Sequence, residues 1–154
     1  MSQPSVPSGS EPLSYLEDVL ALPKKDRQQV QSTLDLIPLS KNGLPVSALK
    51  QLQDKFQIGN KKMSELMGMS ETTLQRRYRA KGRLSEIESQ TVLQLAEIWS
   101  QGMYVFEDAS DLRSWLSSEL PALGGVAPLS LLGTPLGRNH VQELLLRLEW
   151  GIYS

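Results

Sequence analysis

The chain has 154 residues, of which 40% are hydrophobic and 21% are charged, and its formal net charge is −1. These proportions are typical of a soluble globular protein, and the length allows one domain or two small ones. The absence of cysteine excludes disulfide bonds and thiolate metal sites. The first residues lack the pattern of a secretion signal, and no apolar run approaches the roughly 20 residues that span a bilayer. We therefore expect a cytoplasmic protein without a membrane partner.

The N-terminal part is predicted to contain a flexible arm and two short helices. Residues 1–12 are rich in Ser, Pro and Gly, which favours the arm. Residues 14–22 have the spacing of a short amphipathic helix, and residues 26–36 are expected to form a second one.

A loop and a third helix are predicted next. Residues 38–45 are expected to form the loop, because Asn42-Gly43 is a turn signal. Residues 47–56 place apolar side chains on one helical stripe: Leu49, Leu52 and Phe56. This helix is expected to pack behind the pair that follows.

Residues 60–83 predict two short helices joined by a tight turn. The first helix has an apolar stripe, and Gly68 follows it, where a sharp reversal needs a positive φ. Ser70 is then a predicted N-cap for the second helix, with Glu71 at the positive end of that helix's dipole. The second helix is expected to bury Leu74 and Tyr78.

The opposite face of this second helix carries Thr, Gln and Arg side chains, the types that read base edges in the major groove. Residues 60–83 have a charge balance of +5, whereas residues 1–59 are neutral and residues 84–154 carry −6. A basic patch on a reading helix favours a DNA-binding helix-turn-helix over an ordinary helical hairpin with a solvated face. The candidate DNA-binding residues are Lys61, Lys62, Ser70, Thr72, Thr73, Gln75, Arg76, Arg79 and Lys81.

The C-terminal part is predicted to be helical as well. Ser85 and Glu88 form a capping-box pattern that begins a long helix ending near residue 105. We expect this helix to be a core spine rather than a dimer face. Shorter helices are expected after Asp108 and over residues 128–132. Thr134-Pro135 is a pattern that begins the last helix. No strand pattern occurs, so the predicted fold is all-α.

Catalytic motifs are missing. The single histidine, His140, lies on the last predicted helix, no phosphate-binding glycine loop occurs, and the carboxylates show no metal-ligand spacing. We therefore expect a protein that is not an enzyme, with no catalytic residues, metal or cofactor.

The C-terminal run PALGGVAPLSLLGTPLGRNHVQELLLRLEWGIYS resembles the toxin-binding domain of Xre/MbcA/ParS-type antitoxins. Gly133 departs from that pattern, since an acidic residue is frequent there, and so does Trp150, where Tyr is common. The upstream helix-turn-helix is similar to the Xre-like domain of the same antitoxins. The resemblance covers roughly residues 44–154. The expected division is residues 1–43 as an arm with short helices, 44–106 as the DNA-binding domain with the long helix, and 107–154 as the toxin-binding domain.

The resemblance implies a type II antitoxin that binds a RES-domain toxin, blocks its NAD⁺ pocket and represses the shared operon. The implied partners are the toxin, operator DNA and a second copy of the chain, because one reading helix covers only a half-site. The candidate toxin-binding residues are Glu149, Trp150, Gly151, Ile152, Tyr153 and Ser154.

Two alternatives stay open at the level of sequence. The aromatic residues at the C-terminus either anchor in the toxin pocket, beside acidic groups that pair with its cations, or close the domain's own core. The whole chain is either an antitoxin or a stand-alone helix-turn-helix repressor whose C-terminal half dimerises or binds a small ligand.

Overall fold

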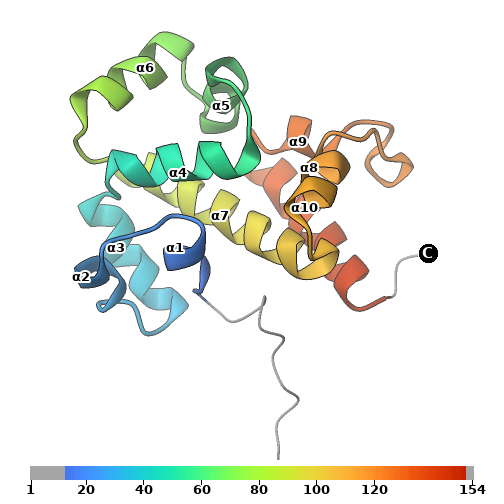
Figure 1. Ribbon diagram of the computed structural model, residues 1–154, viewed down its shortest axis with the longest axis horizontal. Helices are drawn as coiled ribbons and strands as arrows, with labels where there is room; N and C mark the ends of the chain where they lie inside the picture. Colours follow the sequence, from blue (N-terminus) through green and yellow to red (C-terminus); the bar gives the residue numbers. More distant parts are fainter. Residues whose placement is uncertain (1–12, 152–154) are drawn as a thin grey trace, which may run out of the picture.

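The computed structural model describes residues 13–151, and within that range it contains helices and no β-strand, which confirms the all-α prediction. The helices lie in the order shown in Figure 1. They are α1 (Tyr15–Asp18), α2 (Lys24–Arg27), the 3-10 turn η2 (Thr33–Asp35), α3 (Leu36–Asn42), α4 (Val46–Phe56), α5 (Asn60–Met67), α6 (Glu71–Ala80), α7 (Glu86–Phe106), α8 (Ala109–Leu116), the 3-10 turn η3 (Pro121–Leu123), α9 (Pro128–Leu131) and α10 (Pro135–Glu149).

Helix α7 is the spine of the molecule. Figure 1 shows it running through the centre, with α4, α5 and α6 on one side and α8, α9 and α10 beside its C-terminal half. Its 21 residues correspond to a length of about 30 Å. The predicted capping box begins it, because the Ser85 hydroxyl accepts from the Glu88 amide and the Glu88 carboxylate accepts from the Ser85 amide. The prediction of a core spine is confirmed.

The three helices α4, α5 and α6 form the predicted helix-turn-helix unit. Leu49, Leu52 and Phe56 of α4 are buried, as their spacing predicts, and the Phe56 ring lies 5.2 Å from the ring of Trp99 on α7. A short backbone pairing fixes the start of α4 to the segment after α6, since Leu84 N donates to Leu44 O and Val46 N donates to Gly82 O.

The C-terminal helices pack on the second half of α7. Asp108 caps α8 and Thr134 caps α10, each accepting from an amide three residues on, as predicted. The two short elements η3 and α9 join these helices. At the start of α10 the chain passes so close to α9 that a Cβ on Gly137 would lie 1.8 Å from the Leu131 carbonyl oxygen, so only glycine fits there.

The predictions for the N-terminal part are wrong in three places. The helix expected over residues 14–22 is shortened to α1, because the chain reverses at Ala21, which has φ +49°. No single helix covers residues 26–36. Here the Asp35 carboxylate accepts from the Gln31 and Ser32 amides, and this local capping begins a new helical segment instead.

The third correction concerns the loop expected over residues 38–45, much of which is α3. Pro38 lies in the first turn of that helix, where its missing N–H costs no hydrogen bond. Leu39 anchors α3 in the core, and Gly43 ends the helix. The prediction of a flexible arm over residues 1–12 lies outside the described residues. None of the described helices has the length and apolar character needed to cross a membrane.

Candidate functional site

The turn between α5 and α6 has the predicted geometry. Gly68 ends α5 with φ +66°, a conformation that strains residues with a side chain. The Ser70 hydroxyl then accepts from the Thr73 amide at 3.0 Å and donates to the Thr73 hydroxyl at 2.9 Å. The Ser70 hydroxyl is therefore the N-cap of α6, as predicted.

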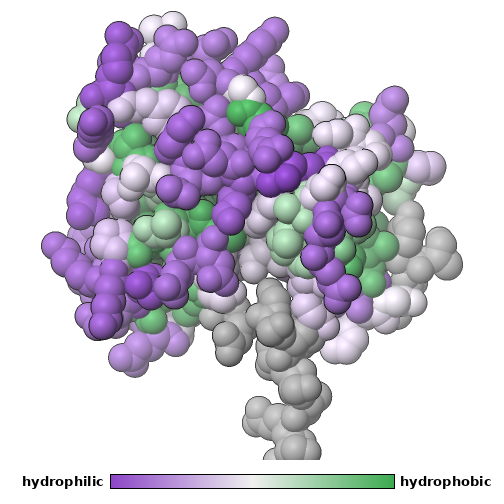
Figure 2. Space-filling model, viewed as in Figure 1, coloured by the Kyte–Doolittle hydropathy of each residue, from purple (hydrophilic) through white to green (hydrophobic). Residues whose placement is uncertain are grey.

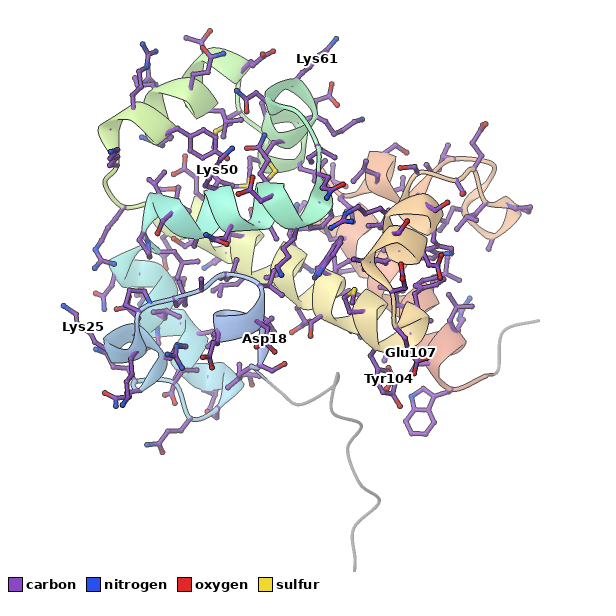
Figure 3. The ribbon with its side chains drawn as sticks, in the orientation of Figure 1. Asp18, Lys25, Lys50, Lys61, Tyr104 and Glu107 are labelled. Atoms are coloured by element: carbon purple, nitrogen blue, oxygen red, sulfur yellow. The ribbon has the colours of Figure 1, made fainter. Side chains whose placement is uncertain are left out.

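The reading face, defined as Thr72, Gln75, Arg76 and Arg79, is exposed along α6, while Leu74 is fully buried and Tyr78 is half-buried behind it. Figure 2 shows hydrophilic surface over the upper part of the molecule, where α5 and α6 lie. Lys61 projects from the start of α5 into solvent on the same side of the molecule (Figure 3). The fold thus brings the predicted reading residues and this lysine to one outer surface.

Two of the seven basic residues between 60 and 83 are paired with acids. Lys62 lies 3.1 Å from Glu65 on its own helix, and the Arg77 guanidinium lies 2.9 Å from the Glu88 carboxylate. The others form no ion pair among the residues that the structure describes: Lys61, Arg76, Arg79, Lys81 and Arg83. The Lys62 pair is largely exposed and contributes little, so Lys62 stays a candidate for a phosphate contact beside Lys61.

The bond between Arg77 and Glu88 fixes the reading helix to the spine. One Glu88 oxygen accepts from the Ser85 amide, and the other accepts two hydrogen bonds from the Arg77 guanidinium. Partial burial would raise the pKa of the Glu88 carboxyl, but the bonds from Ser85 and Arg77 outweigh it and lower that pKa. The capping pattern predicts the first bond only, since the second joins two helices.

A polar cluster holds α4, α5 and α6 together from the inside. Gln53, which is 4% exposed, donates to the Asn60 side chain and the Ile58 carbonyl and accepts from the Tyr78 hydroxyl. Burial, followed by the charge of Asp54, raises the pKa of Tyr78, so its hydroxyl stays protonated and donates. No periodicity of the sequence signals this cluster.

The second candidate surface lies at the end of α10. Trp150 is 73% exposed, so it does not close the core, and the core alternative is wrong for this residue. Leu146, one turn before it, is 43% exposed, and the two side chains extend one apolar stripe of the helix into solvent. Figure 3 shows Tyr104 and Glu107, at the end of α7, close to this end of α10.

Of the other predicted toxin-binding residues, Glu149 and Gly151 lie within the described range. Glu149 is half-buried, and Gly151 ends α10 with φ +67°. The predictions for Ile152, Tyr153 and Ser154 lie outside the described residues. Sequence reasoning did not select Leu146, although its position four residues before Trp150 was a usable signal.

The contact between α10 and α7 contains a buried charge. Arg138 is 6% exposed, and it donates to the Gln94 side chain at 2.5 Å and to the Leu132 carbonyl at 3.1 Å. Burial lowers the pKa of its guanidinium. Gln142 donates to the Glu97 carboxylate beside it. No described cluster of three His, Cys, Asp or Glu side chains is suited to hold a metal ion.

Comparison with known proteins matches both parts of this structure. Residues 35–97 match the model of the antitoxin Xre-like helix-turn-helix domain, and residues 101–151 match that of the antitoxin Xre/MbcA/ParS C-terminal toxin-binding domain. A protein of Sphingobium sp. named Prs ADP-ribosylating antitoxin is 30% identical over 132 residues, which cover 80% of this chain and 83% of that protein. The chain belongs to the Xre-type antitoxin family.

Two further relatives, both named antitoxin Xre, agree with this assignment. The protein of Photorhabdus laumondii is 28% identical over an alignment that covers 73% of this chain and 76% of that protein. The protein of Yersinia enterocolitica is 27% identical over an alignment that covers 77% of this chain and 81% of that protein. The family resemblance is therefore confirmed, and the chain is an antitoxin of a toxin–antitoxin system, with a helix-turn-helix and a toxin-binding domain.

Proposed function

We propose that the antitoxin neutralises a RES-domain, NAD⁺-consuming toxin by placing its C-terminal region, residues 149–154, in the toxin's active site. The exposed Trp150, continued along α10 by Leu146, supports this proposal, because an exposed aromatic side chain beside an aliphatic one is typical of interface anchors. The name of the Sphingobium relative refers to ADP-ribosylation, a reaction that consumes NAD⁺. The proposal assigns no reaction to the antitoxin itself, which acts in the cytoplasm by binding.

Acidic charge supports the same arrangement. Residues 84–154 have a balance of −6, and a site that binds the NAD⁺ pyrophosphate must present positive charge. Acidic side chains of this region would pair with such cations while Trp150 fills an apolar or stacking pocket beside them.

The test compares two exposed apolar residues of one helix. Trp150→Ala should weaken toxin binding by about 30-fold or more, as loss of an interface anchor does. The matched control is Leu136→Ala at the opposite end of α10, because Leu136 is 75% exposed and should change affinity less than about threefold. Affinity is measured by calorimetry with the RES toxin of the neighbouring gene, and neutralisation by growth on co-expression.

Removal of residues 151–154 tests whether the C-terminal region blocks the toxin's active site. The shortened antitoxin should keep its circular dichroism and lose neutralisation. Full neutralisation by it, or equal effects of the two alanine variants, would refute active-site blocking by this end. A toxin from a different family would refute the RES assignment alone.

We further propose that the antitoxin binds its own operator as a homodimer and represses the operon. The exposed reading face and the unpaired cations beside it support DNA contact, and a pseudo-palindromic site would take one α6 per half. The match to a toxin-binding domain favours this dual role over the stand-alone repressor.

Three variants separate base reading from phosphate contact. Arg76→Ala and Gln75→Ala should each weaken operator binding by about 5- to 100-fold and relax base preference at one position. Lys61→Ala should weaken all sequences alike and reduce the slope of log affinity against log salt by about one. Lys25→Ala, an exposed lysine on α2, is the control. The α6 assignment fails if the first three variants bind promoter fragments like the control, and sedimentation of the complex tests the dimer.

A further inference from the structure

A pocket of about 580 Å³ lies between the start of α4 and the end of α6, on the side of α6 away from the reading face. We call it the rear pocket, and its walls include Pro45, Val46, Ser47, Lys50, Tyr78 and Lys81. Its volume is within the range of small-molecule sites, and it is far larger than a single phosphate group requires. Of its walls only Lys81 is also a candidate DNA-binding residue, and the toxin-binding proposal uses none of them.

The chemistry of the walls defines the class of ligand. Pro45, Val46 and the ring of Tyr78 provide apolar surface for a planar body, and the Lys50 ammonium lies 5.6 Å from the Tyr78 ring centroid. Figure 3 shows Lys50 between α4 and α6. Positive charge comes from Lys50 and Lys81, and the positive end of the α4 dipole has the same sign.

These cations are incompletely compensated. Lys50 lies 3.6 Å from Asp54, but both side chains are more than half exposed, so this pair contributes little. Lys81 is exposed and forms no ion pair with any residue of the described range. The Tyr78 ring is held in place by a hydrogen bond, because its hydroxyl donates to the buried Gln53. An aromatic wall is therefore preformed beside two available ammonium groups.

We propose that the rear pocket binds a small planar organic anion, of the size and charge of a mononucleotide. The planar body lies against Tyr78, Val46 and Pro45, and the anionic group pairs with Lys50 and Lys81.

The binding test uses the full chain and 8-anilinonaphthalene-1-sulfonate, a fluorescent anion with a planar naphthalene ring. We expect saturable binding with one site per chain. Lys50→Glu should weaken it at least about tenfold, because a like charge replaces the partner of the sulfonate. Ser47→Phe should also weaken binding of the probe, because the added ring would occupy part of the pocket. The charge-matched control is Lys25→Glu, which should bind like the parent, because Lys25 is exposed on α2 and does not line the rear pocket.

Two comparisons keep the proposal falsifiable. N-phenyl-1-naphthylamine, which lacks the sulfonate, should bind at least about tenfold more weakly, and AMP should displace the anionic probe. Equal binding of the two dyes, loss of binding in Trp150→Ala rather than in Lys50→Glu, or binding at several equivalent sites would overturn the proposal. So would weaker operator binding by Lys50→Glu with unchanged dye binding, since Lys50 would then contact a DNA phosphate. The dye readout requires neither toxin nor DNA, so it is independent of the proposed function.

Discussion

Replacing Glu88 by alanine should destabilise the antitoxin more than any other change to an acidic residue near the start of α7. The variant removes the bond from the Ser85 amide at 2.8 Å and two bonds from the Arg77 guanidinium at 2.9 and 3.2 Å. A capping interaction contributes about 1 kcal/mol. A hydrogen bond to a charged group contributes about 1.5–3 kcal/mol, which the partial exposure of Arg77 reduces.

The expected loss is therefore about 2–3 kcal/mol, or a decrease in melting temperature of roughly 5–10 °C for a chain of this length. The assay is thermal and urea unfolding of the full chain. Glu86→Ala is the control, because Glu86 lies in the same first turn but is exposed, and its loss should cost about 0.5 kcal/mol. If both variants unfold alike, Glu88 does not hold the two helices together.

Acidification gives an independent test of the same residue. The pKa of Glu88 is lower in the folded protein than in the unfolded chain, so its contribution is complete above the ordinary carboxyl pKa. That contribution is lost as pH falls through the lowered pKa, where the folded state must also take up the proton. The difference in unfolding free energy between the parent and Glu88→Ala should therefore shrink between pH 6 and pH 3. A constant difference over this range would contradict the assignment.

Two further changes test the packing of the start of α10 against α9 and α7. Gly137→Ala should destabilise the chain by at least about 2 kcal/mol, because its Cβ would lie 1.8 Å from a backbone oxygen, whereas Gly82→Ala, with no atom within 4 Å of its Cβ, should be tolerated in urea unfolding. Arg138→Ala should cost about 2–4 kcal/mol by the same assay, since it empties a buried site and leaves a carbonyl without its donor. Arg147→Ala, an exposed arginine on the same helix, should cost less than about 0.5 kcal/mol.

Local patterns were enough to place the α-helices from residue 46 onward, although η3 lies where a loop would be expected from the glycine pair. Apolar spacing marked α4, α5 and α10, and Ser70, Ser85, Asp108 and Thr134 marked helix starts by chemistry that acts within one turn. The reading face could be predicted for the same reason, since its residues alternate with buried ones along a single helix. The N-terminal part could not, because its short helices depend on packing against α7 rather than on periodicity of their own.

The amino-acid sequence alone therefore determined the helical class, the helix-turn-helix and the family to which the antitoxin belongs, because each is encoded over a few consecutive turns. Tertiary structure decided which charges are free. It paired Arg77 with Glu88, eleven residues away, and left Lys61 and Arg76 in solvent. It also buried Arg138 and exposed Trp150, although both lie on or next to one helix. Burial and pairing depend on which helices pack against one another. That packing is a property of the complete fold around α7 and not of any single helix.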